Sequence, residues 1–302
     1  MAGRERAEAE QRQLKASVAY KAELIENMSS LLQRRLLDEA HGKTNNVAMS
    51  RERDSRVQSN DTALFESLLS ELDALYEKAD EVISACGPSI KPWASMSYQP
   101  TRKWHNGTEY FENVDSTLVP FDFQRTCRAV WQAFIATEGP DAYYYEGVKD
   151  PENMVAVRMC CQYQWEAFGV ASMTSHFVTR KYKEADRLVF VWRALSEGED
   201  AFVGMYLDDS GWGVVSPVAK GAGDPMTAGS SVSVVDGDAS DSTIIQHVVR
   251  SVPVFFGEKS SSDTKMDQYV NLVVRSGVED VEEIVRSMRK LLLDDTVVSV
   301  SS

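Results

Sequence analysis

The residue types that most often perform catalysis are scattered through this sequence. The four histidines, His41, His105, His176 and His247, are far apart along the chain. The sequence contains no P-loop, no GxGxxG, no GxSxG and no HExxH motif. His176 and His247 fall on expected strands and could face one interior, although a hydrogen-bonded core or rim histidine is the commoner case. We therefore predict no catalytic residues, no cofactor and no enzymatic activity.

Charged residues on the expected strands are the next candidates for chemistry. Arg158, Glu166, Arg193 and Arg250 all fall in such segments. An unpaired charge inside a protein is costly, so an inward-facing Arg–Glu pair would need to meet each other or the polar head of a ligand. The alternative is that these side chains face outward into water, and we predict this orientation for most of them.

Neither the cysteines nor the clustered aspartates indicate a metal site. The four cysteines contain no CxxC pair, and successive residues of a strand point to opposite faces, so we predict buried, reduced thiols at Cys86, Cys127, Cys160 and Cys161. Three aspartates follow a glycine-rich stretch but lack the complete calcium-loop pattern, so we predict a solvated loop around Asp236, Asp238 and Asp241.

Composition and charge restrict the class of protein. The chain has 302 residues, 43% of them hydrophobic, and a formal net charge of −14. Residues 1–60 hold 11 Lys and Arg against 9 Asp and Glu, so the acidic excess belongs to the remainder. A nucleic-acid surface needs cations, so we do not expect nucleic-acid binding. No secretory signal and no run of about 18 apolar residues is visible, and we expect a cytoplasmic protein, with the nucleus as the alternative.

The elements that must position any functional residue centre on Met154–Gly198. The first segment alternates apolar and polar side chains with period two, as a strand with one dry face does; its apolar set is Val155, Val157, Met159, Cys161, Tyr163 and Trp165. Second and third strands are expected at residues 171–183 and 187–195. This antiparallel meander requires an apolar cover on its dry face.

The rest of the chain supplies further elements. We predict helices over residues 61–85, 122–137 and 265–293, and a hairpin around Asn106-Gly107 whose second strand covers residues 110–119. Short strands are expected at 201–207 and 212–218, separated by a turn at Asp208-Asp209-Ser210-Gly211, and a longer strand at 243–256. The terminal helix carries a continuous apolar stripe and is the natural cover for the meander. The expected fold class is α+β.

The N-terminal segment is treated as a separate region. Residues 4–40 are rich in helix-forming residues and carry a short seam of apolar residues, and 41–60 read as a polar linker. We predict a region 1–58, comprising this helix and linker, followed by one domain over 59–302. The helix either forms a coiled-coil homodimer or docks on its own domain.

The order of these elements resembles the helix-grip fold of START (START/Bet v 1-like) domains. The local amino-acid sequence also resembles that of a group of oomycete START-like proteins labelled mating-specific. The segments that carry this resemblance are Val178–Asp200, Gly211–Pro217, the segment ALYEKADEVISACG and the terminal helix. The resemblance covers roughly residues 61–295. It implies a curved antiparallel sheet wrapped around the C-terminal helix, with an apolar tunnel for a lipid or another hydrophobic molecule. Many such relatives carry a basic zipper-like helix ahead of the domain, but this chain lacks a dense basic block.

Three functional hypotheses follow. The first is a non-enzymatic carrier or sensor that encloses a hydrophobic ligand between sheet and terminal helix, with the lining residues Met159, Cys161, Tyr163, Phe190, Trp192, Val281, Ile284 and Met288. The second is an interaction module that dimerises through residues 4–40, with the START-like body as scaffold. The third is an enzyme built on the same fold, which a cavity with a polar, pKa-perturbed cluster would favour.

Overall fold

The computed structural model describes residues 61–87, 90–105, 107–136, 142–165, 169–218, 242–255 and 262–299. The predicted coiled coil (4–40), the linker and the aspartate-containing loop lie outside these residues. The chain divides into two compact units, Met1–Leu64 and Phe65–Ser302, and the sheet and the helices from residue 72 onward belong to the second unit. The domain boundary expected between residues 58 and 59 stays a prediction.

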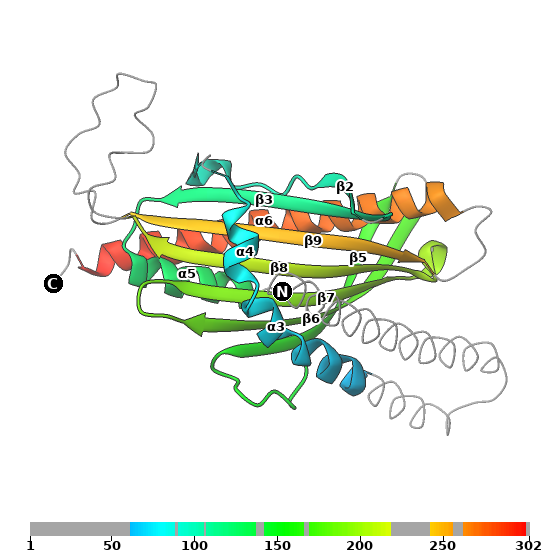
Figure 1. Cartoon of the computed structure of the whole chain (residues 1–302), viewed down its shortest axis with the longest axis horizontal. Helices are drawn as coiled ribbons and strands as arrows, with labels where there is room; N and C mark the ends of the chain where they lie inside the picture. Colours follow the sequence, from blue (N-terminus) through cyan, green and yellow to red (C-terminus); the bar gives the residue numbers. More distant parts are fainter. Residues whose placement is uncertain are drawn as a thin grey trace, which may run out of the picture. The chain divides into compact units, whose positions relative to one another are not determined.

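One curved sheet is the centre of this unit (Figure 1). In the described part of the chain it has nine strands in the order β1-β3-β9-β8-β7-β6-β5-β4, with β2 paired to β3. The strands are β1 (Lys91–Pro92), β2 (Thr101–His105), β3 (Thr108–Val119), β4 (Tyr143–Tyr144), β5 (Met154–Trp165), β6 (Gly169–Lys183), β7 (Leu188–Gly198), β8 (Met205–Pro217) and β9 (Thr243–Phe255). Because β1 runs parallel to β3, the sheet is mixed, and the prediction of a purely antiparallel sheet is wrong at this edge.

The predicted meander is confirmed. β5, β6 and β7 are antiparallel neighbours, and β8 and β9 continue the series until β9 pairs with β3. The predicted hairpin also forms, because Gly107 adopts φ +77° in the turn between β2 and β3. These outcomes follow from the strict alternation of β5 and from an Asn-Gly step, which are strong local signals.

The turn predicted at Asp208-Asp209-Ser210-Gly211 is wrong. β8 runs unbroken from Met205 to Pro217, and these four residues pair with β7 and β9 like their neighbours. The ladder hydrogen bonds on both sides outweigh the local turn preference of Asp, Ser and Gly. Consequently, Asp209 occupies an inward-facing position of a central strand.

Two helices cover the inner face of the sheet, the face that carries Phe190 and Trp192. They are α5 (Phe123–Ile135), whose first turn is capped when Asp122 Oδ1 accepts from the amide of Arg125 at 3.0 Å, and α6 (Ser262–Ser299). Figure 1 shows α6 running along the sheet on the opposite side from α3 and α4. Met288 and Leu292 of α6 join Phe190 and Trp192 in one buried cluster. The long terminal helix predicted from its apolar stripe is therefore the cover of the sheet.

The helix predicted over residues 61–85 is broken. It forms a helical segment at 61–70, α3 (Leu72–Tyr76) and α4 (Ala79–Ser84). The amides of Glu71 and Lys78 bond to the carbonyls three residues earlier, which are tighter turns than an α-helix makes. These bends let residues 72–84, the α3–α4 strap, cross several strands of the outer face (Figure 1).

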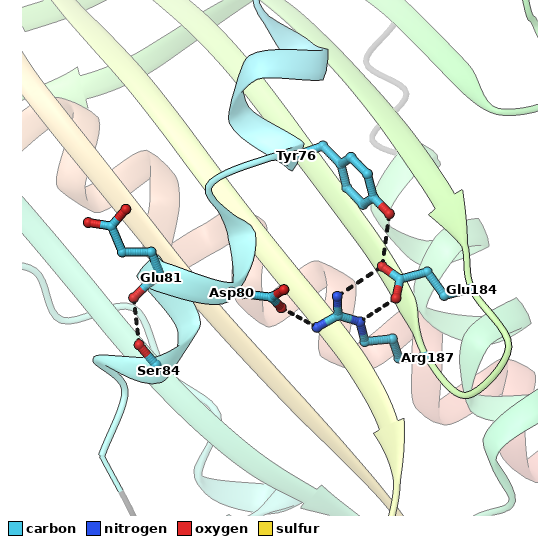
Figure 2. A network of polar contacts seen from close by, with 6 residues as sticks. All are labelled: Tyr76, Asp80, Glu81, Ser84, Glu184 and Arg187. Atoms are coloured by element: carbon cyan, nitrogen blue, oxygen red, sulfur yellow. Dashed lines mark hydrogen bonds and ion pairs between the residues drawn. The ribbon is translucent and has the colours of Figure 1, made fainter. Parts of the chain in front are cut away.

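Polar contacts hold the α3–α4 strap on the sheet (Figure 2). Arg187 bridges Asp80 of the strap and Glu184, and Tyr76 donates a hydrogen bond to Glu184 at 3.0 Å. The ring of Tyr76 also stacks on Tyr182 at 3.9 Å. The strap thus occupies the outer face, and any ligand site between helix and sheet lies on the inner face.

Four smaller predictions can be compared directly with the structure. Arg193 does point outward, where it is buried between Glu71 and Asp208. His176 packs on Phe65 at the outer face, whereas His247 lies on the inner face, so the two histidines share no interior. All four cysteines are free, but the predicted burial is wrong: Cys160 is exposed, and the other three are only partly buried. In the described part of the chain, no helix combines the length and apolarity needed to cross a membrane.

Candidate ligand cavity

A cavity of about 230 Å³ lies between the inner face of the sheet and helices α5 and α6. A single water needs only about 10–15 Å³ of such space, so this cavity can hold a molecule of many atoms. Its lining comes from β5, β6, β7, β8, β9, α5 and α6, together with the segment before β2. Most of these residues are apolar.

Seven of the eight residues predicted to contact a ligand line this cavity: Met159, Cys161, Phe190, Trp192, Val281, Ile284 and Met288. Tyr163 does not line it. Its hydroxyl donates to Oγ of Ser276 at 2.6 Å, which links β5 to α6, and Ser276 itself lines the cavity. The period of two on strands and the helical stripe on α6 therefore bring the predicted residues together, and their contact with a ligand stays a prediction.

Aromatic rings form the apolar end of the cavity. Phe134 of α5 lies 5.0 Å from Phe190 and 5.2 Å from Trp192 between ring centroids, and Phe177 adds a further ring at 5.6 Å. Two glycines of β8 make room for the sheet-side rings. A Cβ on Gly211 would come within 1.9 Å of the Trp192 ring, and one on Gly213 within 2.1 Å of Phe190.

The cavity lining also contains ionisable side chains, among them Asp209, Asp280 and Tyr98. Burial is the main cause that raises the pKa of Asp209 to about 7, and the nearby Asp208 carboxylate adds to the rise. Burial likewise raises the pKa of Asp280 to about 6, with Glu279 contributing. By its accessible surface, however, Asp280 is an exposed residue of α6, so its carboxyl group lines the cavity where the cavity reaches solvent. Both carboxylates raise the pKa of Tyr98, and all three side chains line the cavity.

His247 lies on the same face but is held neutral. Its Nε2 accepts a hydrogen bond from the Asn113 amide at 3.2 Å, and the Asn113 oxygen accepts from the amide of Gln99 at 2.7 Å, which fixes this orientation. Burial lowers the pKa of His247. The nearby carboxylate of Asp115 is already engaged by Lys91 at 2.9 Å and by Thr117 at 2.8 Å.

Sequence reasoning missed Asp209, Asp280 and Tyr98 as cavity residues. Two of them carried a usable signal. Asp209 keeps the period of two with Met205, Leu207 and Gly211, and Asp280 lies three and four residues from Gly277 and Ile284, within the stripe of α6. Both were passed over because aspartate favours turns and solvated faces. Tyr98 precedes β2 in an irregular segment, and no periodicity places it.

Comparison with known proteins adds little to this geometry. No protein-family model and no curated protein matches the chain. Solved structures that match include a conserved protein from Geobacillus kaustophilus, 11% identical over 59% of this chain and 95% of that one, with a TM-score of 0.31. An uncharacterized protein from Rhizobium leguminosarum is 8% identical over 65% and 99%, with a TM-score of 0.30. A hypothetical protein from Helicobacter pylori is 11% identical over 64% and 97%, with a TM-score of 0.31.

Proposed function

We propose that this protein binds a lipid or another hydrophobic small molecule in the cavity between the sheet and α6, as a non-enzymatic carrier or sensor. The observation that carries the proposal is the cavity itself, with its mainly apolar lining. Well-packed cores contain few voids larger than a water molecule, so a space of this size is unusual unless it has an occupant. A cytoplasmic location accompanies this proposal.

We also propose that residues 59–302 form a START-like domain with the helix-grip fold, related to the oomycete group named above. A curved sheet with one long C-terminal helix on its inner face supports that assignment. The quoted sequence phrases support it independently of the fold.

The test is recovery of a ligand. The full chain, purified under native conditions, is analysed by native mass spectrometry and by extraction into organic solvent. We expect an additional mass that is released by extraction. A protein that is always empty and binds no alkyl or fluorescent fatty-chain probe would contradict the proposal.

A cavity-filling variant connects that result to this site. Val281→Trp on α6 places a large ring in the space, so we expect probe affinity to fall at least tenfold while the protein stays folded. Val203→Trp is the matched control, because Val203 is 54% exposed on the surface. Equal probe binding by both variants would place the ligand elsewhere.

Enzymatic proton transfer is a second candidate, favoured by the near-neutral pKa values of Asp209 and Asp280 inside a cavity. The two candidates differ in whether the bound molecule changes. Incubating the recovered compound with the protein in D₂O distinguishes them, because a proton-transfer enzyme would introduce deuterium or convert the compound.

The dimerisation hypothesis for residues 4–40 remains the alternative to ligand binding. Deletion of residues 1–58 tests it, because loss of a dimerising helix would halve the mass of the protein in solution.

A further inference from the structure

The charged groups in the cavity are all of one sign. Its lining includes the carboxyl groups of Asp209 and Asp280, and the described lining residues include no lysine and no arginine. Arg193 donates a hydrogen bond to the main-chain carbonyl of Asp209, but its side chain lies on the outer face with Glu71 and Asp208 and does not line the cavity. The cavity therefore has an acidic end without a cation of its own.

The other polar groups do not compensate for this charge. Oδ1 of Asp209 is buried and has no well-aligned hydrogen-bond partner in the described part of the structure; the Ser251 hydroxyl and the Arg193 charge lower the pKa of Asp209 but do not offset the rise that burial causes. His247 is neutral, because its Nε2 is an acceptor and burial opposes its protonation. Tyr98 remains an uncharged phenol, because burial and the two carboxylates raise its pKa.

We propose that the cavity selects a hydrophobic molecule that carries one protonated nitrogen, an amphiphilic amine, and that Asp209 and Asp280 receive this cation. The inference rests on the proposed ligand-binding function. A buried carboxylate is costly unless it is paired, so a cation supplied by the ligand removes that cost. A fatty acid or a phosphate-bearing lipid would bring a third negative charge to the same end and is disfavoured.

The geometry divides the ligand between two regions. The alkyl or ring portion lies against Phe134, Phe190 and Trp192, and the nitrogen lies near Asp280 and Asp209. Tyr98 and Ser276 stand at this end as uncharged hydrogen-bonding groups. A protonated amine carries several N–H donors and can therefore meet a carboxylate and a hydroxyl together.

The affinity for the amine should depend on pH, because the two carboxyl groups must be ionised to pair with the cation. The titratable and charged groups around the two carboxyls are Tyr98, Cys161, Tyr163, Arg193, Asp208, His247, Tyr269 and Glu279. The empty protein protonates Asp209 and Asp280 as the pH falls through about 7 and 6. Amine affinity therefore rises from pH 5 to pH 8, and binding releases protons.

The experiment compares three probes with the same chain length, decylamine, decan-1-ol and decanoate, the two ionic probes below their micellar concentrations and decan-1-ol below its solubility limit. Isothermal titration calorimetry at pH 7.5 measures each affinity for the full-length protein. We expect decylamine to bind roughly tenfold or more tighter than decan-1-ol, since a charge-assisted contact contributes about 1.5–3 kcal/mol. Decanoate should bind most weakly.

Two variants assign the effect to the carboxyl groups. Asp280→Asn and Asp209→Asn should each bring the decylamine affinity towards that of decan-1-ol, with decan-1-ol binding unchanged. Glu279→Gln is the matched control: it removes the same charge from the neighbouring position of α6, where Glu279 pairs with Arg275 outside the cavity lining. Unchanged decan-1-ol binding also shows that each variant is folded.

The outcomes separate this inference from the proposed function. Decanoate binding as tightly as decylamine, or an amine preference that survives both Asp variants, would overturn the amine inference while leaving a hydrophobic site. Failure of all three probes to bind would overturn the proposed function and the inference together.

Discussion

At the scale of single residues, Gly211 and Gly213 determine how the cavity wall is built. Each glycine lies opposite an aromatic residue of β7, Trp192 and Phe190 respectively, and both rings lie over the space that a side chain on β8 would fill. Glycine in a central strand ordinarily weakens it. Here the destabilising effect of the two glycines is offset by the packing of the Trp192 and Phe190 rings, which form the wall of the cavity.

Gly211→Ala should lower the free energy of unfolding by about 1–3 kcal/mol, because the added methyl group overlaps the Trp192 ring. Urea denaturation measures the effect. The control is the same substitution in a Trp192→Ala background, where the overlap is absent and the cost should vanish. Equal destabilisation in both backgrounds would show that the backbone, and not the ring, requires glycine.

Asp209 should make stability depend on pH. Its pKa in the folded protein is raised to about 7, so the folded state binds a proton more tightly than the unfolded chain does. The unfolding free energy therefore falls as the pH rises from about 4 to about 7. Asp209→Asn should remove this component and, above pH 7, stabilise the protein by about 1–3 kcal/mol, less than the full shift implies because water in the cavity screens the charge. A wild-type contribution that rises with pH would contradict the assignment.

At the scale of elements, the start of the α3–α4 strap is attached to the sheet through the buried side chain of Arg193, which pairs with Glu71, the residue directly before the strap. Arg193 has a side chain that is 8% exposed and contacts Glu71 at 2.9 Å and Asp208 at 2.7 Å. It also donates to the carbonyl of Asp209 and to Ser210. Trp212 adds a bond from its indole nitrogen to the carbonyl of Leu75 at 2.9 Å. The outer layer therefore depends on polar contacts as well as on apolar burial.

Arg193→Met should destabilise the protein by about 1–3 kcal/mol, because it removes the charge-assisted contacts to the partly exposed Glu71 and Asp208 and the hydrogen bonds to the Asp209 carbonyl and to Ser210. Arg275→Met is the control, since Arg275 is 53% exposed in its pair with Glu279 and should contribute less than about 1 kcal/mol. Thermal or urea unfolding of both variants measures the difference. Similar losses for the two would mean that the Arg193 network contributes no more than a surface pair.

Elements with a strong period were the predictable part of this fold. β5, β6, β7 and α6 could be located from their side-chain patterns, and seven cavity residues came with them. The unbroken β8 and the broken helix over 61–85 were not predictable, because both depend on neighbouring strands that come from distant parts of the sequence. The distance between sheet and α6, which separates a packed core from a cavity, is set by tertiary packing and has no local signal.

At the scale of the whole molecule, Phe65–Ser302 is a compact unit that contains every lining residue of the cavity. A ligand that binds only the folded state stabilises it by about 2.7 kcal/mol at a hundredfold excess over its Kd. Binding should consequently raise the melting temperature of the full chain and of a chain that lacks residues 1–58 by the same amount.

Deleting residues 1–58 should leave probe binding unchanged and, if residues 4–40 dimerise, should reduce the mass in solution to that of a monomer. Multi-angle light scattering measures the mass, and calorimetry measures binding. An unchanged monomeric mass would eliminate the dimerisation hypothesis, whereas loss of probe binding would show that the N-terminal region contributes to the site.

The continuous course of β8 has a consequence for how such a protein can diversify. Asp209 occupies an inward position whose backbone groups are satisfied by β7 and β9 whatever side chain it carries. A substitution at an inward position of β8 can therefore change the polarity of the cavity lining without altering the strand pairing, the helix placement or the connectivity. Strand pairing depends on the main-chain atoms of these residues, whereas the polarity of the cavity lining depends on their side chains.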